Sequence, residues 1–190
     1  MVSRASDFLR EFRDVQKHPL RRLVPREVIK WSPPDESVYK INFDRAVFEE
    51  QGSVELGVVV RDSAGLVISA LSKKIRFPGL AVMVEALAAR RAVLFAKEIS
   101  VFGVVVEGDS LQVIKAVNSS KRSKTTYGHI IDETRLLSSS LSCCNFVHVQ
   151  REGNKLAHAL ARQAAVSADT DVWMEDLPHD LYDVLLFDLA

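Results

Sequence analysis

Three acidic residues stand at positions from which their carboxylates could reach one divalent cation. Asp44 ends a segment, 39–44, whose alternating apolar and polar side chains predict a strand. Asp109 follows a run of valines that predicts a buried parallel strand, and Glu85 lies on the alanine-rich face of a predicted helix. Burying a carboxylate on such a face costs free energy unless a positive charge meets it. We therefore expect Asp44, Glu85 and Asp109 to bind a divalent cation together.

Each of these carboxylates also has a structural interpretation. Asp44 could be a turn carboxylate at the end of a strand, and Asp109 could cap the helix that follows it. A cap uses only one carboxylate oxygen, so capping by Asp109 is compatible with cation binding. Glu85 has the weakest structural interpretation, because its neighbours at helical spacing are alanines.

The predicted elements form an α/β domain with a mixed sheet. Strands are predicted near residues 39–44, 56–60, 66–75, 104–106 and 145–149, and helices near 82–97, 111–117, 130–141 and 154–165. The first three strands should form an antiparallel meander, and right-handed crossovers place the last two strands parallel to the first. The carboxyl ends of the first and fourth strands are then neighbours, which is where open α/β sheets place their sites.

Length and composition are those of an ordinary globular protein. The chain has 190 residues and a net charge of zero, which suits one compact domain with appendages. No apolar run approaches a membrane span, and the N-terminal residues lack the apolar core of a signal peptide. We therefore expect an intracellular protein, cytoplasmic or nuclear, that is not secreted and contacts no membrane. The adjacent Cys143 and Cys144 are expected to be reduced thiols.

Three segments are predicted along the chain. Residues 1–30 should form an amphipathic helix followed by a basic linker, and residues 31–168 should form the main domain. Residues 169–190 carry acidic side chains but no lysine or arginine, so they are predicted to be an acidic C-terminal tail.

Basic side chains form two local clusters within the predicted main domain. One leaves the third strand and the other crowds a polar loop between two helices: Lys73, Lys74 and Arg76, and Lys121, Arg122 and Lys124. Either cluster could be a solvated surface, because the charge between the two ends of the chain is only mildly positive. Beside a carboxylate site, four of these residues are candidates for phosphate contacts: Lys73, Lys74, Arg76 and Lys121.

Five motifs in sequence order resemble the ribonuclease H-like domain of plant retroelement-derived reverse transcriptases. The motifs are Lys40–Asp44, Val58–Gly65, Val84–Ala89, Glu107–Ser110 and Val149–Ala157, within a similarity that runs from about Trp31 to Ala168. The resemblance implies the ribonuclease H-like fold, a five-stranded mixed sheet flanked by helices. It also implies an endonuclease that hydrolyses the RNA strand of an RNA–DNA hybrid with two magnesium ions, for which manganese can substitute.

The resemblance also implies the catalytic residues. Asp44, Glu85 and Asp109 take three of the four positions that hold the ions in the family. His158 takes the fourth position, where the familiar pattern has aspartate. Arg45 is a second departure, because the family usually has glycine after the first aspartate. Both departures fall at the site.

The implied partner is an RNA–DNA hybrid, bound by a monomer through groove shape and phosphates rather than through base edges. The candidate contacts are basic or polar side chains: Arg45, Lys73, Lys74, Arg76, Lys121, Arg151 and Asn154. A surface ion pair and a helix cap would explain Arg151 and Asn154 equally well.

Two functions from different classes remain open. The first is a hybrid-specific endonuclease. The alternative is a non-catalytic, domesticated ribonuclease H-like module that binds nucleic acid or protein, and Arg45 and His158 are the features that favour it. Incubation with a labelled hybrid in magnesium or manganese distinguishes the two.

Overall fold

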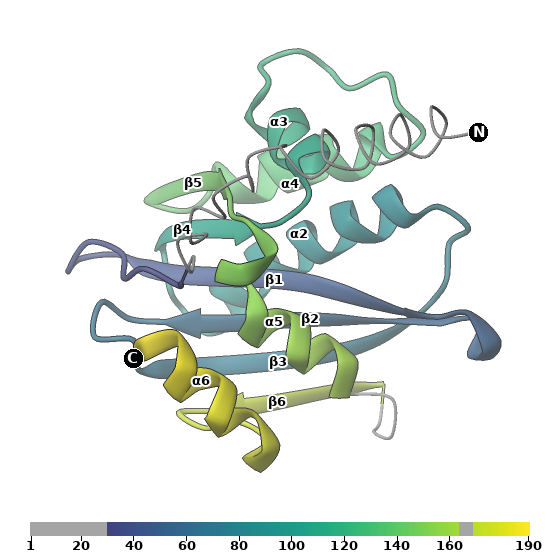
Figure 1. Cartoon of the computed structure of the whole chain (residues 1–190). Helices are drawn as coiled ribbons and strands as arrows, with labels where there is room; N and C mark the ends of the chain where they lie inside the picture. Colours follow the sequence, from purple (N-terminus) through teal and green to yellow (C-terminus); the bar gives the residue numbers. More distant parts are fainter. Residues whose placement is uncertain (1–29, 164–168) are drawn as a thin grey trace, which may run out of the picture.

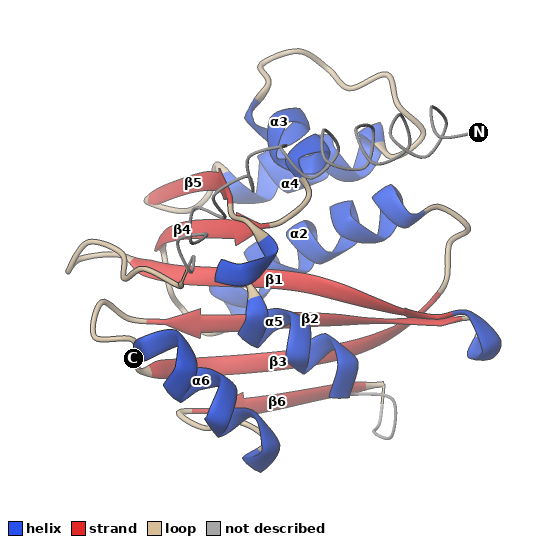
Figure 2. Ribbon diagram, in the orientation of Figure 1, coloured by secondary structure: helices blue, strands red, loops and turns tan. Residues whose placement is uncertain are grey.

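The computed structural model describes residues 30–163 and 169–190, so the predicted N-terminal helix and most of the basic linker lie outside the described residues. A mixed sheet carries helices on both of its faces (Figures 1 and 2). The strands are β1 (Tyr39–Phe48), β2 (Ser53–Arg61), β3 (Val67–Arg76), β4 (Gly103–Gly108), β5 (Cys143–His148) and β6 (Thr170–Met174). The helices are α2 (Ala81–Glu98), α3 (Leu111–Asn118), α4 (Gly128–Ser138), α5 (Lys155–Gln163) and α6 (Tyr182–Leu189).

The strand order across the sheet is β5-β4-β1-β2-β3-β6. β1, β2 and β3 form the predicted antiparallel meander, and β4 and β5 run parallel to β1 on its other side. In the parallel pair of β1 and β4, Asn42 lies opposite Glu107. The predicted mixed α/β architecture is therefore confirmed, and the carboxyl end of β4 lies beside β1.

The sheet has one strand more than the five that the sequence predicted. β6 pairs with β3 in antiparallel register, with Ser69 opposite Met174, and the Ser69 hydroxyl donates to the Trp173 carbonyl at 2.7 Å. Residues 169–190, predicted to be an acidic tail, thus supply an edge strand and the helix α6. The prediction was wrong about this segment because its pairing partner, β3, lies about a hundred residues earlier in the chain.

Apolar side chains fill both faces of the sheet. Under α2, β1 directs Ile41 and Phe43 into the larger core, where small residues such as Ala88 and Ala92 let the helix lie close to the strands. The opposite face has a smaller core beneath α5 and the C-terminal segment. It contains Val59, Ala70, Leu156, Leu160, Leu177 and Leu181. Figure 1 shows α5 and α6 in front of the sheet and α2 behind it.

Gly57 of β2 allows α5 to approach the sheet closely. A Cβ atom at Gly57 would lie 2.4 Å from the carbonyl oxygen of Ala157 and 2.7 Å from the backbone nitrogen of Ala161. Real Cβ atoms do not come so near to backbone atoms, so this position requires glycine. The contact fixes the distance between β2 and the helix that carries His158.

A chain of buried polar side chains, which we call the polar network, runs beneath α6. Arg61 at the end of β2 donates to Asp188 of α6 and to the Asn42 side chain of β1, each at 3.1 Å. The Asn42 amide donates to Glu107 of β4 at 3.1 Å, and Glu107 pairs with Lys40 of β1 at 2.7 Å. All five residues are buried. The network therefore links α6, β2, β1 and β4.

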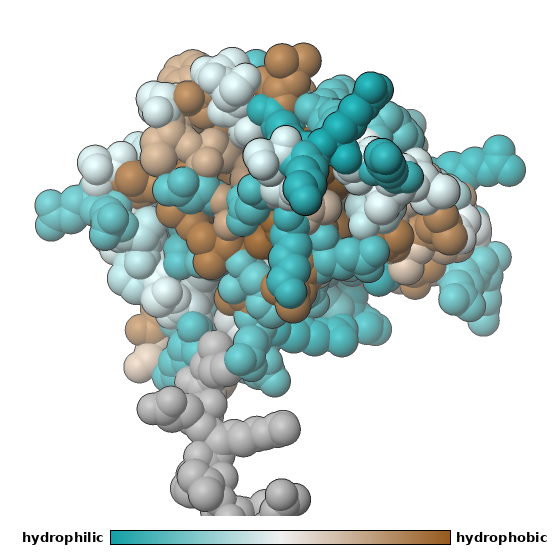
Figure 3. Space-filling model, turned by 90° about the horizontal axis from the view of Figure 1, so that it is seen from above, coloured by the Kyte–Doolittle hydropathy of each residue, from teal (hydrophilic) through white to brown (hydrophobic). Residues whose placement is uncertain are grey.

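None of the helices within the described residues is long and apolar enough to cross a membrane. On the face that carries α3 and α4, hydrophilic side chains are interspersed with separate apolar patches (Figure 3). The exposed apolar side chains of these two helices include Leu111 and Leu136. Scattered apolar residues of this kind are normal on a protein surface.

Candidate metal site and active site

β1 and β4 bring Asp44 and Asp109 to the same place. The pairing of β1 with β4 stops at Asn42, because β4 ends at Gly108 and the chain then turns away through Asp109. The sequence had suggested that Asp44 ends its strand. β1 instead continues to Phe48, so Asp44 lies within the strand. A Cβ atom at Gly108 would lie 2.3 Å from the Phe43 ring, so glycine is required where the strand ends.

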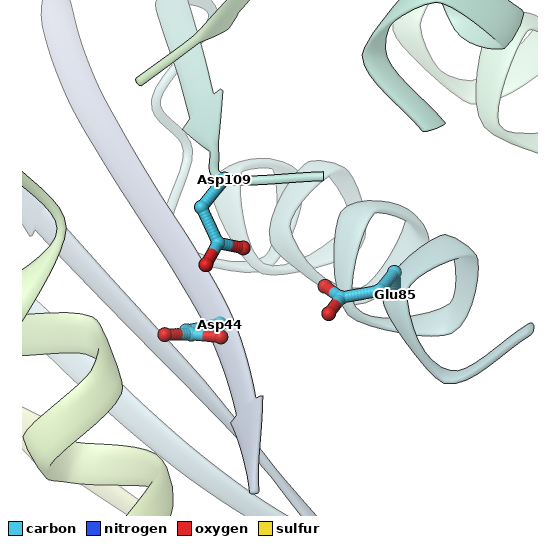
Figure 4. Close-up of side chains that lie close together, drawn as sticks. All are labelled: Asp44, Glu85 and Asp109. Atoms are coloured by element: carbon cyan, nitrogen blue, oxygen red, sulfur yellow. The ribbon is translucent and has the colours of Figure 1, made fainter. Parts of the chain in front are cut away.

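α2 brings Glu85 to the same point from behind the sheet. Carboxylate oxygens of Asp44, Glu85 and Asp109 all lie within 4.8 Å of one another (Figure 4). Asp44 is 4% exposed, Glu85 is 8% exposed, and Asp109 is half-buried. The predicted convergence of the three carboxylates is therefore present. Asp109 is the only one of the three that is substantially accessible to solvent.

Burial and mutual repulsion raise the proton affinity of these carboxylates. Burial, reinforced by the charge of Asp109, raises the pKa of Asp44 from 3.8 to about 7. Burial also raises the pKa of Glu85 from 4.5 to about 7, although the nearby Arg45 guanidinium acts in the opposite direction. The site therefore holds more negative charge than the protein stabilises well.

The residues present fit a divalent cation. Oε2 of Glu85 is buried and has no hydrogen-bond partner, and the Glu85 side chain points toward the other two carboxylates (Figure 4). A buried carboxylate oxygen without a partner costs free energy that a cation would recover. Carboxylate oxygens are also the ligands that hard cations such as magnesium and manganese prefer.

Arg45 makes an ion pair with a member of this cluster. Its Nε donates to Oε1 of Glu85 at 2.8 Å, and its backbone N–H donates to Oδ1 of Asp44 at 2.7 Å. The Arg45 side chain is 27% exposed. The sequence predicted Arg45 as a nucleic-acid contact, and the structure places it between solvent and the site carboxylates.

His158 contacts Asp44 but has no free lone pair to offer. Its Nε2 lies 3.0 Å from Nη2 of Arg151, and its Nδ1 lies 2.9 Å from Oδ2 of Asp44. Because arginine can only donate, Nε2 must accept, and the proton of the neutral ring then sits on Nδ1 and is donated to Asp44. Burial and the charge of Arg151 lower the pKa of His158, which agrees with a neutral ring. His158 therefore orients Asp44.

Two further predicted contacts lie near α5, and one of them is corrected. Asn154, predicted as a nucleic-acid contact, is 1% exposed, and its side-chain amide donates to the Phe43 carbonyl at 2.9 Å. It ties the start of α5 to β1 just before Asp44, so it is not a surface contact. Arg151 is exposed next to His158, as a nucleic-acid contact requires.

The predicted basic contacts on β3 lie on one flank of the site. Lys73 lies opposite Leu56 of β2, which lies opposite Arg45 of β1, so Lys73 and Arg45 belong to one row across the sheet. Lys73 and Arg76 border a cavity between β3 and α2. Lys74 lies 4.0 Å from the buried Glu55. Lys121 is exposed in the loop between α3 and α4.

One residue beside the site had no role in the sequence interpretation. Nε2 of His148 lies 3.1 Å from the carbonyl oxygen of Asp109, and His148 is exposed. The parallel register sets His148 opposite Gly108, the residue before Asp109. The only sequence signal was therefore its position at the end of the predicted fifth strand.

Comparison with known proteins agrees with this fold. Residues 42–164 match the family model described as reverse transcriptase-like. RNase H1 from the halophilic archaeon Halobacterium salinarum NRC-1 has a similar structure, with a TM-score of 0.62 and 22% identity over 69% of this chain and 99% of its own. The N-terminal RNase H domain of Rv2228c from Mycobacterium tuberculosis has a TM-score of 0.59 and 20% identity over 67% of this chain and 92% of its own.

A third solved structure contains a nucleic acid. LC11-RNase H1, in complex with an RNA/DNA hybrid, has a TM-score of 0.56 and 22% identity over 66% of this chain and 94% of its own. No match was found among curated proteins. At these identities the solved structures establish a likeness of fold, and the predicted ribonuclease H-like fold is confirmed.

Proposed function

Because the chain belongs to the reverse transcriptase-like family and has a ribonuclease H-like fold, we propose that it is a divalent-cation-dependent endonuclease that hydrolyses the RNA strand of RNA–DNA hybrids. One observation carries the proposal. Asp44, Glu85 and Asp109 converge within 4.8 Å at the end of β4, and Glu85 keeps a buried oxygen without a partner. Such a cluster is poorly stable without a cation, and it lies at the sheet edge where α/β folds place their sites.

Asp44, Glu85 and Asp109 would hold the cations, with magnesium as the expected ion and manganese as a substitute. Bound divalent cations supply Lewis-acid activation of water and neutralise charge on a phosphodiester. The protein contributes position. His158 and the backbone N–H of Arg45 each fix one oxygen of Asp44, and Asn154 ties α5 to β1 beside it. These contacts keep Asp44 from rotating when substrate binds.

The substrate proposal rests on the basic side chains that surround the carboxylates. Arg45 and Lys73 lie two strands apart in one row, a separation of about 10 Å at the usual strand spacing. Arg151 is exposed on the other side of Asp44, next to His158. Basic side chains arranged in this way can bind the phosphates of a helical nucleic acid. Such contacts recognise the geometry of the backbone rather than the base sequence.

A cleavage assay tests the proposal. A duplex with one end-labelled RNA strand paired to DNA is incubated with the protein in magnesium, in manganese and in chelator. We expect cleavage of the RNA strand in either metal and none in chelator. The matched substrates are double-stranded RNA and double-stranded DNA of the same sequence. The absence of cleavage of every substrate in both metals would reject the proposal.

A second candidate function is a non-catalytic module that binds hybrid or protein. The observation that favours it is the occupation of the site by the protein's own side chains. Arg45 pairs with Glu85, and His158 offers no lone pair where the family pattern has a carboxylate. Hybrid binding that is unchanged in chelator, together with no cleavage, would support this alternative.

A further inference from the structure

Arg45 already supplies a positive charge to the carboxylate cluster. Its guanidinium Nε lies 2.8 Å from Oε1 of Glu85. Among the described residues it is the only lysine or arginine whose side chain forms an ion pair with Asp44, Glu85 or Asp109. The nearby Arg151 is instead directed at Nε2 of His158.

The pairing between Arg45 and Glu85 is incomplete. Only one oxygen of Glu85 is bound, and the other is buried without a partner. The Arg45 side chain keeps contact with solvent, whereas the Glu85 side chain is 11% exposed. The guanidinium can therefore leave without disturbing the core, but the carboxylate cannot. An exchange of partners at this site would move the arginine and leave Glu85 in place.

A guanidinium and a divalent cation cannot both be close to Glu85 at low cost. A cation within reach of all three carboxylates would come within a few ångströms of Arg45, where two positive charges repel each other strongly in a partly buried site. Binding of one therefore opposes binding of the other.

We propose that Arg45 is an internal counter-ion that competes with the divalent cation for Glu85, so that the cation binds only when the guanidinium leaves this carboxylate. The inference rests on the proposed cation site and adds a control on its occupancy. Arg45 keeps the site neutral enough to fold when cations are scarce, and it raises the cation concentration needed for occupancy. Once released, the guanidinium lies at the mouth of the site, where a phosphate would approach.

Manganese binding to the purified protein tests the inference without relying on cleavage. Free manganese is measured by its electron paramagnetic resonance signal during titration of the parent, Arg45→Gln, Arg45→Lys and Arg90→Gln proteins. Arg90 is the matched control, because its side chain is 31% exposed and it pairs at 2.7 Å with Glu133, which is not one of the three site carboxylates. Asp109→Asn identifies the part of the binding that belongs to the site.

We expect Arg45→Gln to bind manganese about tenfold more tightly than the parent, the effect of removing one positive charge next to the site. Arg45→Lys keeps the charge and should stay close to the parent, and Arg90→Gln should equal it. In chelator, Arg45→Gln should unfold at a lower temperature than the parent, since Glu85 loses its counter-charge. Its unfolding temperature should then rise more than that of the parent when manganese is added.

Two failures are distinguishable. If the parent binds manganese and Asp109→Asn does not, but Arg45→Gln binds no more tightly than the parent, then the cation site stands and the competition is refuted. If neither the parent nor Arg45→Gln binds manganese more tightly than Asp109→Asn, then the cation site itself is wrong, and the inference falls with it.

Discussion

Asp109 is the least buried of the three site carboxylates, so it can be changed with little damage to packing. Its charge raises the pKa of both Asp44 and Glu85. Asp109→Asn should therefore relieve repulsion and stabilise the protein in chelator at pH 8 by about 1 kcal/mol, or roughly 2–4 °C. The same variant should lose the stabilisation that manganese gives the parent. Thermal unfolding followed by circular dichroism measures both effects, with the exposed Asp35→Asn as control.

The raised carboxyl pKa values also set how stability depends on pH. The folded protein holds protons on Asp44 and Glu85 up to about pH 7, whereas the unfolded chain releases them near pH 4. The folded state thus binds more protons, and stability in chelator should rise as pH falls from 8 to 6.5. Below 6.5 the lowered pKa of His158 acts in the opposite direction, because the unfolded chain then takes up the extra proton.

Thermal unfolding in chelator at pH 8 and pH 6.5 tests this dependence. Burial raises the pKa of Glu55 in the same way, so Glu55→Gln separates its contribution from that of the site. In manganese the trend should reverse, because the cation needs deprotonated carboxylates and its binding releases protons. An unfolding temperature in chelator that falls from pH 8 to pH 6.5 would contradict the assignment.

His158 limits the negative charge at the site. His158→Asp places a carboxylate beside Asp44, with Arg151 within reach as its partner. We expect tighter magnesium binding and more magnesium-supported cleavage, by about tenfold, and lower stability in chelator because of the added repulsion. His158→Asn introduces a side chain of the same size as aspartate but without its charge, so it should increase neither magnesium binding nor cleavage. Equal magnesium affinity in the Asp and Asn variants would show that charge at this position is not limiting.

At the scale of elements, the distance between α5 and β2 decides where His158 lies. Gly57→Ala would push a Cβ atom against the backbone of α5, so we expect a loss of about 1–3 kcal/mol and weaker hybrid binding or cleavage. Gly103→Ala on β4 is the control, because its Cβ atom would lie 3.5 Å from the nearest atom, the carbonyl oxygen of Ser37, which is an ordinary contact. Urea denaturation compares the two. Equal losses of stability would mean that the close approach of α5 is not the cause.

Elements with a strong local pattern were predictable from the sequence. The alternation in β1, the valines of β4 and the alanine face of α2 each reflect burial against a neighbour, and they were sufficient to place Asp44, Asp109 and Glu85 together. β6 has no such pattern. Val172 and Met174 are apolar but exposed, whereas the acidic Asp171 is partly buried. The sequence of β6 therefore does not indicate a strand, which forms through pairing with β3.

The partners of the site residues were not predictable, because they depend on contacts between distant segments. The resemblance gave His158 the fourth position of the site, but the position of Arg151 decides which of its ring nitrogens carries the proton. Arg61 lies in the Val58–Gly65 motif, and its charged side chain is fully buried because it pairs with Asp188, which lies 127 residues later in the chain. Local periodicity contains no information on such pairs.

At the scale of the whole molecule, α6 is held by a buried ion pair in addition to the apolar contacts of Val184 and Leu185 with the smaller core. Asp188 is the one fully buried residue of this helix, and neither its side chain nor that of Arg61 is exposed. Asp188→Ala would leave a buried guanidinium without its partner, so we expect a loss of about 3–5 kcal/mol. Asp183→Ala, at an exposed position of the same helix, should change stability little. Chemical denaturation measures the stability of both variants. A small loss for Asp188→Ala would mean that Arg61 becomes solvated or forms an ion pair with another neighbour.

The polar network has a consequence for how the molecule opens. Arg61 joins α6 to Asn42, and Asn42 is two residues from Asp44 on the same strand. α6 cannot detach alone without leaving the buried charge of Arg61 unpaired, so we expect that it does not unfold locally. We therefore expect α6 and β1 to form one cooperative unit, in which the amide hydrogens of both elements exchange with solvent in the same slow event.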